Sequence, residues 1–85
     1  MYLYLGQETV VRTEDVVAVF DLENTSTSHL TRAYLANAQR SGNIIEVSED
    51  LPRSFIICER GGASAVYLSH ISPATLKKRL QDLAR

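Results

Sequence analysis

The chain has 85 residues, 45% of them hydrophobic, and a formal net charge of −1 at pH 7. A domain this small buries only about 60–65% of the surface its unfolded chain exposes, so we expect a single domain over residues 1–85 with a thin core. The composition excludes a disordered tail, and the near-neutral charge argues against a strongly basic nucleic-acid binder. No run approaches the roughly 20 apolar residues of a membrane helix. The N-terminus also lacks the basic region of a signal peptide, so we expect a cytoplasmic protein without a membrane partner.

The single cysteine and the unequal charge of the two halves of the chain both bear on whether copies of the protein associate. The single cysteine, Cys58, cannot form an internal disulfide, and with two distant histidines it gives no zinc spacing, so we expect no metal and no cofactor. Oligomerisation is the remaining way to support a thin core, and it predicts a homo-oligomer. Residues 1–50 carry three basic and eight acidic groups, whereas residues 51–85 carry six and two. Such a division suits either a phosphate-facing surface or head-to-tail association of copies.

The first half of the chain predicts a hairpin, a strand and a helix. Residues 2–5 and 9–11 are β-prone and flank a three-residue turn at 6–8. The apolar run at residues 16–20 predicts a central strand covered on both faces. After a loop rich in capping residues at 23–28, a helix is expected from about 28 to 41, and Gly42 ends it. Its expected apolar stripe consists of Leu30, Ala33, Tyr34 and Ala38.

The second half predicts three strands and a final helix. The strands lie at residues 44–47, 54–58 and 63–69, the last two joined by a turn at 60–62. Ser72 is a good N-cap and Pro73 suits the first helical position. An apolar stripe along this helix then consists of Leu76, Leu80 and Leu83. The order β-β-β-α-β-β-β-α predicts an α+β fold with a small, mostly antiparallel sheet and two helices.

Five basic residues are candidates for contact with DNA. Lys77, Lys78 and Arg79 concentrate positive charge on the last helix, where they either contact phosphates or form a solvated face. Arg53 and Arg60 flank the strand at 54–58. We expect these two arginines to lie apart, because five strand residues span roughly 17 Å.

Other polar and aromatic side chains are expected to be structural. Cys58 is expected to be a buried core thiol, and His70 a packing residue beside the helix cap. No nucleophile, base and orienting carboxylate occur together, so we expect no catalytic residue and no enzyme. The tyrosines are expected to be half-buried packing groups rather than platforms for bases: Tyr2, Tyr4, Tyr34 and Tyr67.

Four segments occur along the chain in a recognisable order: YLYLG at 2–6, TEDVVAVFD at 13–21, PRSFII at 52–57 and SPATLKKR at 72–79. Together they resemble the bacterial extracellular-matrix regulators of the Rem family, most closely the RemB-like branch. The resemblance implies a fold likened to half of a LytTR-type DNA-binding domain. It further implies a cytoplasmic protein that regulates matrix genes at DNA and assembles into rings that gather weak phosphate contacts.

One departure from the family pattern leaves two functions open. The RemA-like pattern has arginines in the loop before the apolar strand and just ahead of the Val-Ala-Val strand. Here the loop reads SEDLPR at 48–53, and Glu14 and Asp15 precede the other strand, so Arg53 is the arginine retained. One reading is a regulator that acts at DNA directly or through a DNA-binding relative. Because acidic groups repel phosphate, the other reading is a protein-interaction or scaffold module without direct DNA binding.

Overall fold

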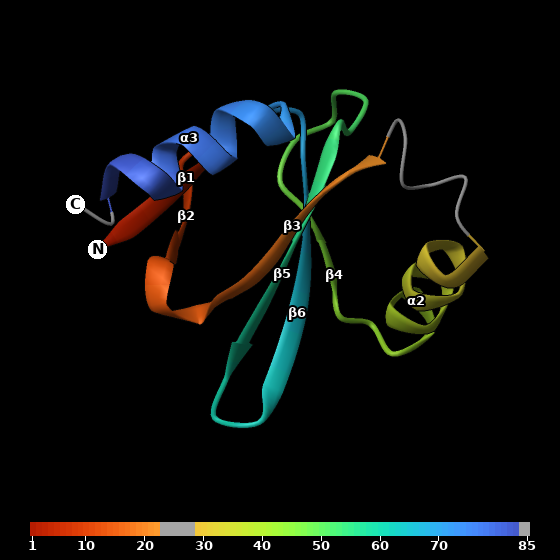
Figure 1. Ribbon diagram of the computed structural model, residues 1–85. Helices are drawn as coiled ribbons and strands as arrows, with labels where there is room; N and C mark the ends of the chain where they lie inside the picture. The colour runs from red at the N-terminus through yellow and green to blue at the C-terminus, as the bar shows by residue number, and fades with distance from the viewer. Residues whose placement is uncertain (23–28, 84–85) are drawn as a thin grey trace.

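The structure is a computed structural model that describes residues 1–22 and 29–83. Its order of elements confirms the predicted α+β fold (Figure 1). The elements before the loop at 47–53 are β1 (Tyr2–Gly6), β2 (Thr9–Arg12), the 3₁₀ turn η1 (Thr13–Asp15), β3 (Val16–Asp21), α2 (His29–Arg40) and β4 (Ile44–Glu46). Those after it are β5 (Ser54–Arg60), β6 (Ala63–Ser69) and α3 (Pro73–Leu83).

The main sheet has four strands in the order β3-β5-β6-β4. The pairs β3–β5 and β5–β6 are antiparallel, as predicted for most of the sheet, whereas β4 pairs with β6 in parallel. The prediction that residues 16–20 form a central strand is wrong, because β3 lies at an edge and Val17 is 57% exposed. The register of β3 shifts between Val16 and Ala18, and the intervening Val17 has no partner in β5.

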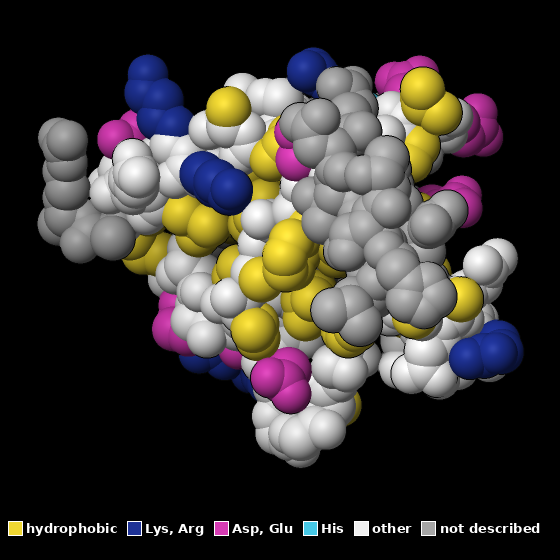
Figure 2. Space-filling view, turned by 45° about the vertical axis from the view of Figure 1, so that its right-hand side comes forward, with side chains coloured by type: hydrophobic (Ala, Val, Ile, Leu, Met, Phe, Trp, Pro, Cys, Tyr) yellow, Lys and Arg dark blue, Asp and Glu magenta, His cyan; other side chains and the backbone are white. Residues whose placement is uncertain are grey.

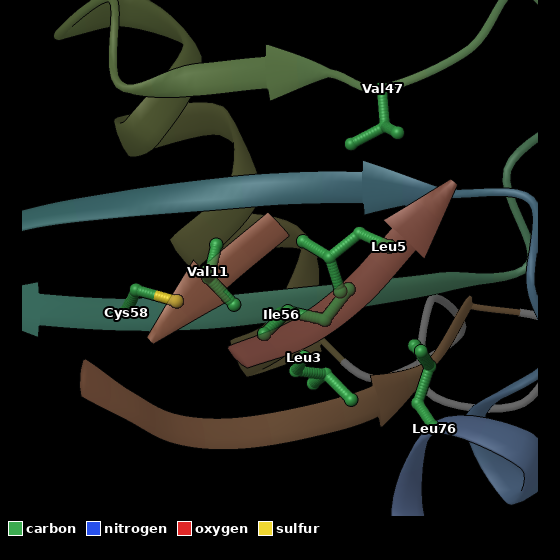
Figure 3. Close-up of a cluster of buried hydrophobic side chains, with 7 residues drawn as sticks. All are labelled: Leu3, Leu5, Val11, Val47, Ile56, Cys58 and Leu76. Carbon is green, nitrogen blue, oxygen red and sulfur yellow. The ribbon is translucent and has the colours of Figure 1, made fainter. Parts of the chain in front are cut away.

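One face of this sheet is covered by the β1–β2 hairpin and by α3 (Figure 1). Figure 3 shows the side chains that converge there from five segments of the chain: Leu3, Leu5, Val11, Val47, Ile56, Cys58 and Leu76. Leu80 packs against the same cluster, and Leu83 is half-buried, so the predicted leucine stripe faces the core. Burial of this stripe fixes α3 across the hairpin.

The opposite face carries a smaller cluster beneath α2 (Figure 1). Its buried members are Ala38, Phe55 and Val66. The predicted stripe on α2 is partly wrong, since Ala33 and Tyr34 are exposed and Leu35 packs on the cluster instead. The side chain of Leu30 and the loop at 23–28 lie outside the described residues, so those predictions stay open.

The predicted start of α3 and the predicted end of α2 are both confirmed. The Ser72 hydroxyl accepts a hydrogen bond from the Thr75 amide (3.2 Å), which makes Ser72 the N-cap of α3. At the end of α2, Gly42 has φ +74°, and the amides of Gly42 and Asn43 donate to the carbonyls of Gln39 and Ala38. This is the Schellman arrangement that a glycine stop favours.

The first hairpin differs from its prediction in one respect. Gly6 ends β1 and pairs with Thr9, so the turn consists of Gln7 and Glu8, both at positive φ (48° and 63°). The predicted three-residue turn included Gly6, which instead pairs with Thr9, and the register shifts between Tyr4 and Gly6.

Candidate nucleic-acid interface

Arg53 is held by backbone hydrogen bonds on both sides. Its amide donates to the carbonyl oxygen of Ser69 (2.9 Å), and its carbonyl oxygen accepts from the amide of Leu22 (3.0 Å). The residue therefore continues β5 by one position and joins the ends of β3 and β6. Its side chain is exposed at that edge of the sheet. These bonds to the sheet thus fix the backbone position of Arg53.

Arg53 and Lys77 line one hollow of about 420 Å³ at the start of α3. Ser72, Pro73 and Ala74 complete its helical wall, and Asp21 adds a carboxylate. The partial positive charge of a helix N-terminus adds to the two side-chain cations. The hollow is therefore a positively charged recess with a single opposing carboxylate among the described residues that line it.

The other basic candidates lie elsewhere. Arg60 ends β5 beside the turn at Gly61 and Gly62, at the far end of the strand from Arg53. The seven residues of β5 span roughly 23 Å, so the expected separation of the two arginines is confirmed. Lys78 is exposed on α3 and does not line the recess.

Arg79 turns toward the hairpin instead. Its Nη1 donates a hydrogen bond to the carbonyl oxygen of Tyr4 (3.2 Å), and its guanidinium lies 5.8 Å from the centre of the Tyr4 ring. These contacts join α3 to β1. A role for Arg79 at phosphate stays a prediction, and it would compete with this docking contact.

Acidic groups occupy the two places where the resemblance described above led us to expect arginines. Glu14 accepts hydrogen bonds from Arg12 (2.7 Å to Nη2) and Thr13 (3.0 Å), and its Oε1 lies 3.5 Å from the N-terminal ammonium. These contacts, led by the Arg12 hydrogen bond, lower the pKa of Glu14 to about 2. In the loop after β4, Glu49 and Asp50 line a hollow together with Glu46. At both places a carboxylate therefore stands where a cation was expected.

The two groups weighed for catalysis have structural positions. Cys58 is buried in the cluster below the hairpin, and burial, with a smaller effect of Asp15, raises the pKa of its thiol to about 11. His70 packs against Gly6, and its buried Nδ1 has no hydrogen-bond partner in the described part of the chain.

Comparison with known proteins identifies the family of this chain. A family model described as RemA-like, extracellular matrix regulatory protein A-like, matches residues 2–80. The chain belongs to this family. Extracellular matrix regulatory protein B of Bacillus subtilis (strain 168) is 30% identical over 81 residues, which cover 95% of this chain and 91% of that protein. The resemblance to the Rem family, including its RemB-like branch, is confirmed.

For this RemA-like chain, two features of the recess were not foreseen. Sequence reasoning did not connect Arg53 with Lys77, which are 24 positions apart. It also overlooked Asp21, although a polar residue directly after an apolar strand is a usual sign of a sheet edge where loops gather.

No described helix combines the length and apolar composition that a membrane crossing demands.

Proposed function

We propose that this Rem-family protein is a non-enzymatic cytoplasmic regulator of extracellular matrix genes that self-associates and acts at DNA. The observation that carries the proposal is the recess in which Arg53 and Lys77 lie beside the start of α3. The relative named extracellular matrix regulatory protein B supports the regulatory class. One recess offers few phosphate contacts, so repetition of the recess in a homo-oligomer supplies the affinity that one copy lacks.

The experiment is a fluorescence-polarisation titration of labelled duplexes, of random and of promoter sequence, at about 50 mM and about 200 mM salt. We expect binding at the lower salt and a loss of about tenfold or more in Arg53→Glu and Lys77→Glu. Arg60→Glu is the matched control, since it makes the same charge change at the opposite end of β5. Absence of binding at low salt, or an equal loss in Arg60→Glu, contradicts direct DNA contact at the recess.

A second function is favoured by the acidic loop after β4. Glu46, Glu49 and Asp50 lie around a hollow that Leu51, 86% exposed, also lines. An exposed leucine among carboxylates suits a protein partner better than phosphate. This module would act through a DNA-binding relative. A pull-down with the tagged protein that recovers nucleic acid and no protein contradicts it, whereas recovery of a partner that Leu51→Ser abolishes supports it.

A further inference from the structure

An apolar groove lies between α2 and the sheet, which we call the α2 groove. It has a volume of about 750 Å³, and its apolar walls include Leu22, Leu35, Ala36, Ile44, Pro52 and Leu68. Figure 2, which brings this side forward, shows apolar side chains gathered at the centre of the face. Among the described side chains of this face, Ala38, Phe55 and Val66 are buried, whereas the others that pack on them, such as Leu22 and Leu35, are only partly buried.

The rim of the α2 groove is acidic. Glu46 lines the groove and also the neighbouring hollow, to which Glu49, Asp50 and Leu51 contribute. No described lysine or arginine lines either hollow. An occupant of the groove should therefore be apolar at its centre and positively charged at its edge.

Such a surface exists on the other side of the same molecule. Tyr2, Tyr4 and Val10 are 65%, 45% and 52% exposed. The expectation of a half-buried packing group is therefore wrong for Tyr2, whereas Tyr4 is half-buried and packs against Arg79. Tyr4 pairs with Val10 and Tyr2 with Arg12, which places all four on one face of the hairpin. We call this the hairpin outer face.

Positive charge accompanies the hairpin outer face. Arg79 lies over the Tyr4 ring, and Arg12, paired with Glu14, stands opposite Tyr2. Glu8 lies at the turn, and Glu14 offsets the charge of Arg12. The face is thus apolar, with the Arg79 guanidinium beside it.

We infer that the hairpin outer face of one copy docks in the α2 groove of the next. The inference rests on the self-association proposed above and names its two surfaces. The hairpin and α2 cover opposite faces of the sheet (Figure 1), so the contact joins two different surfaces and adds copies head to tail. Arg79 beside the hairpin outer face then meets the acidic rim, which orients each copy.

The exposed side chains of the hairpin supply part of the area that such a contact needs. Complete burial of an aromatic side chain removes about 150–250 Å² from solvent, and Tyr2 and Tyr4 are 65% and 45% exposed, so the two rings supply about a quarter of the roughly 800 Å² that a stable interface needs on each side. Val10, which is 52% exposed, adds to this area.

The test uses variants that each block one surface at an exposed position. Tyr2→Glu, or Val10→Glu as a second variant, places a carboxylate on the hairpin outer face. Ala36→Glu, or Gln39→Glu as a second variant, places one in the α2 groove. Val17→Glu is the matched control for Val10→Glu, since both valines are exposed strand residues (57% and 52%) and Val17 belongs to neither surface. Circular dichroism checks that each variant is folded.

Light scattering over a wide concentration range gives the readout. We expect wild type and Val17→Glu to be larger than a monomer and each blocked variant to be a monomer. A mixture of a hairpin-blocked and a groove-blocked variant retains one intact hairpin face and one intact groove, so it should form a dimer and nothing larger. Blocked variants that keep the wild-type mass, or a mixture that stays monomeric, overturn the docking while self-association stands. A monomeric wild type at all concentrations overturns self-association as well.

Discussion

Ser54 and Ser69 face each other across the β5–β6 pair, and each donates a 2.8 Å hydrogen bond to a carbonyl oxygen outside the sheet. Ser54 bonds to Ile71, just before α3, and Ser69 bonds to Leu5 in the hairpin. Both serines are completely buried. This pair therefore holds the hairpin and the start of α3 at the end of the sheet where Arg53 and Lys77 line the recess.

Ser69→Ala should destabilise the protein more than Ser54→Ala. The Ser69 hydroxyl also accepts from the Ile71 amide (3.1 Å), so its removal leaves two buried backbone groups without a partner, at about 2–4 kcal/mol. Removal of the Ser54 hydroxyl leaves one group unpaired, at about 1–2 kcal/mol. Urea unfolding measures the difference, with the exposed Ser64→Ala as the control. If Ser54→Ala loses more unfolding free energy than Ser69→Ala, the two-bond role of the Ser69 hydroxyl is contradicted.

Gly6→Ala should be more damaging than Gly61→Ala, although both glycines have positive φ (+109° and +58°). A Cβ at Gly6 would lie 2.7 Å from Cε1 of His70, whereas one at Gly61 meets no atom within 4 Å. We expect a loss of about 3 kcal/mol for Gly6→Ala and about 1 kcal/mol for Gly61→Ala. His70→Ala should recover part of the first loss in a double-mutant cycle. Equal losses in thermal unfolding would show that the contact with His70 is unimportant.

Glu14 should make stability depend on acid pH. Its pKa is lowered from 4.5 to about 2 in the folded chain, chiefly by the Arg12 hydrogen bond. The folded state therefore favours the charged carboxylate, and this stabilisation, present above pH 4.5, disappears as the pH falls through about 2. Glu14→Gln should flatten the unfolding free energy across this window, and salt at about 1 M should weaken the effect because the pair is exposed. If the unfolding free energy of Glu14→Gln changes with pH as steeply as that of the wild type, the Arg12–Glu14 pair is not the cause of the pH dependence.

Cys58 should be inert in the native protein. Burial holds its thiol pKa at about 11, and the thiolate is the reactive form. We expect the disulfide reagent DTNB at pH 8 to label Cys58 slowly in buffer and completely in urea. The rate in buffer should rise in Leu3→Ala, which opens the cluster above Cys58. Rapid, complete labelling of the native chain would contradict a buried thiol.

Asp21→Asn should strengthen binding to DNA if phosphate enters the recess. Asp21 is the carboxylate that lines it with Arg53 and Lys77, so its neutralisation removes repulsion. We expect an affinity gain of about three- to tenfold at low salt, shrinking as salt increases. Glu59→Gln at the far end of β5 is the control with the same change in net charge. A gain of the same size in both variants would assign the effect to net charge alone.

Much of the fold could be predicted because its signals are local. Ser72 and Pro73 start α3, Gly42 ends α2, and the unbroken run of buried or half-buried residues at 54–58 reflects a strand covered on both faces. These signals arise from the backbone groups left unpaired at helix ends and from the period of the strand. The expectation of one domain over residues 1–85 stays a prediction.

The sequence by itself determined the order of elements, the caps and the leucine stripe of α3. Tertiary structure decided that β3 is an edge strand, that β4 runs parallel to β6, and that Arg53 and Lys77 share a recess while Arg79 stacks on Tyr4. The physical reason is the range of the interactions. Periodicity and capping act within a few residues, whereas strand order and the recess depend on hydrogen bonds such as Ser69 to Leu5, between residues 64 positions apart.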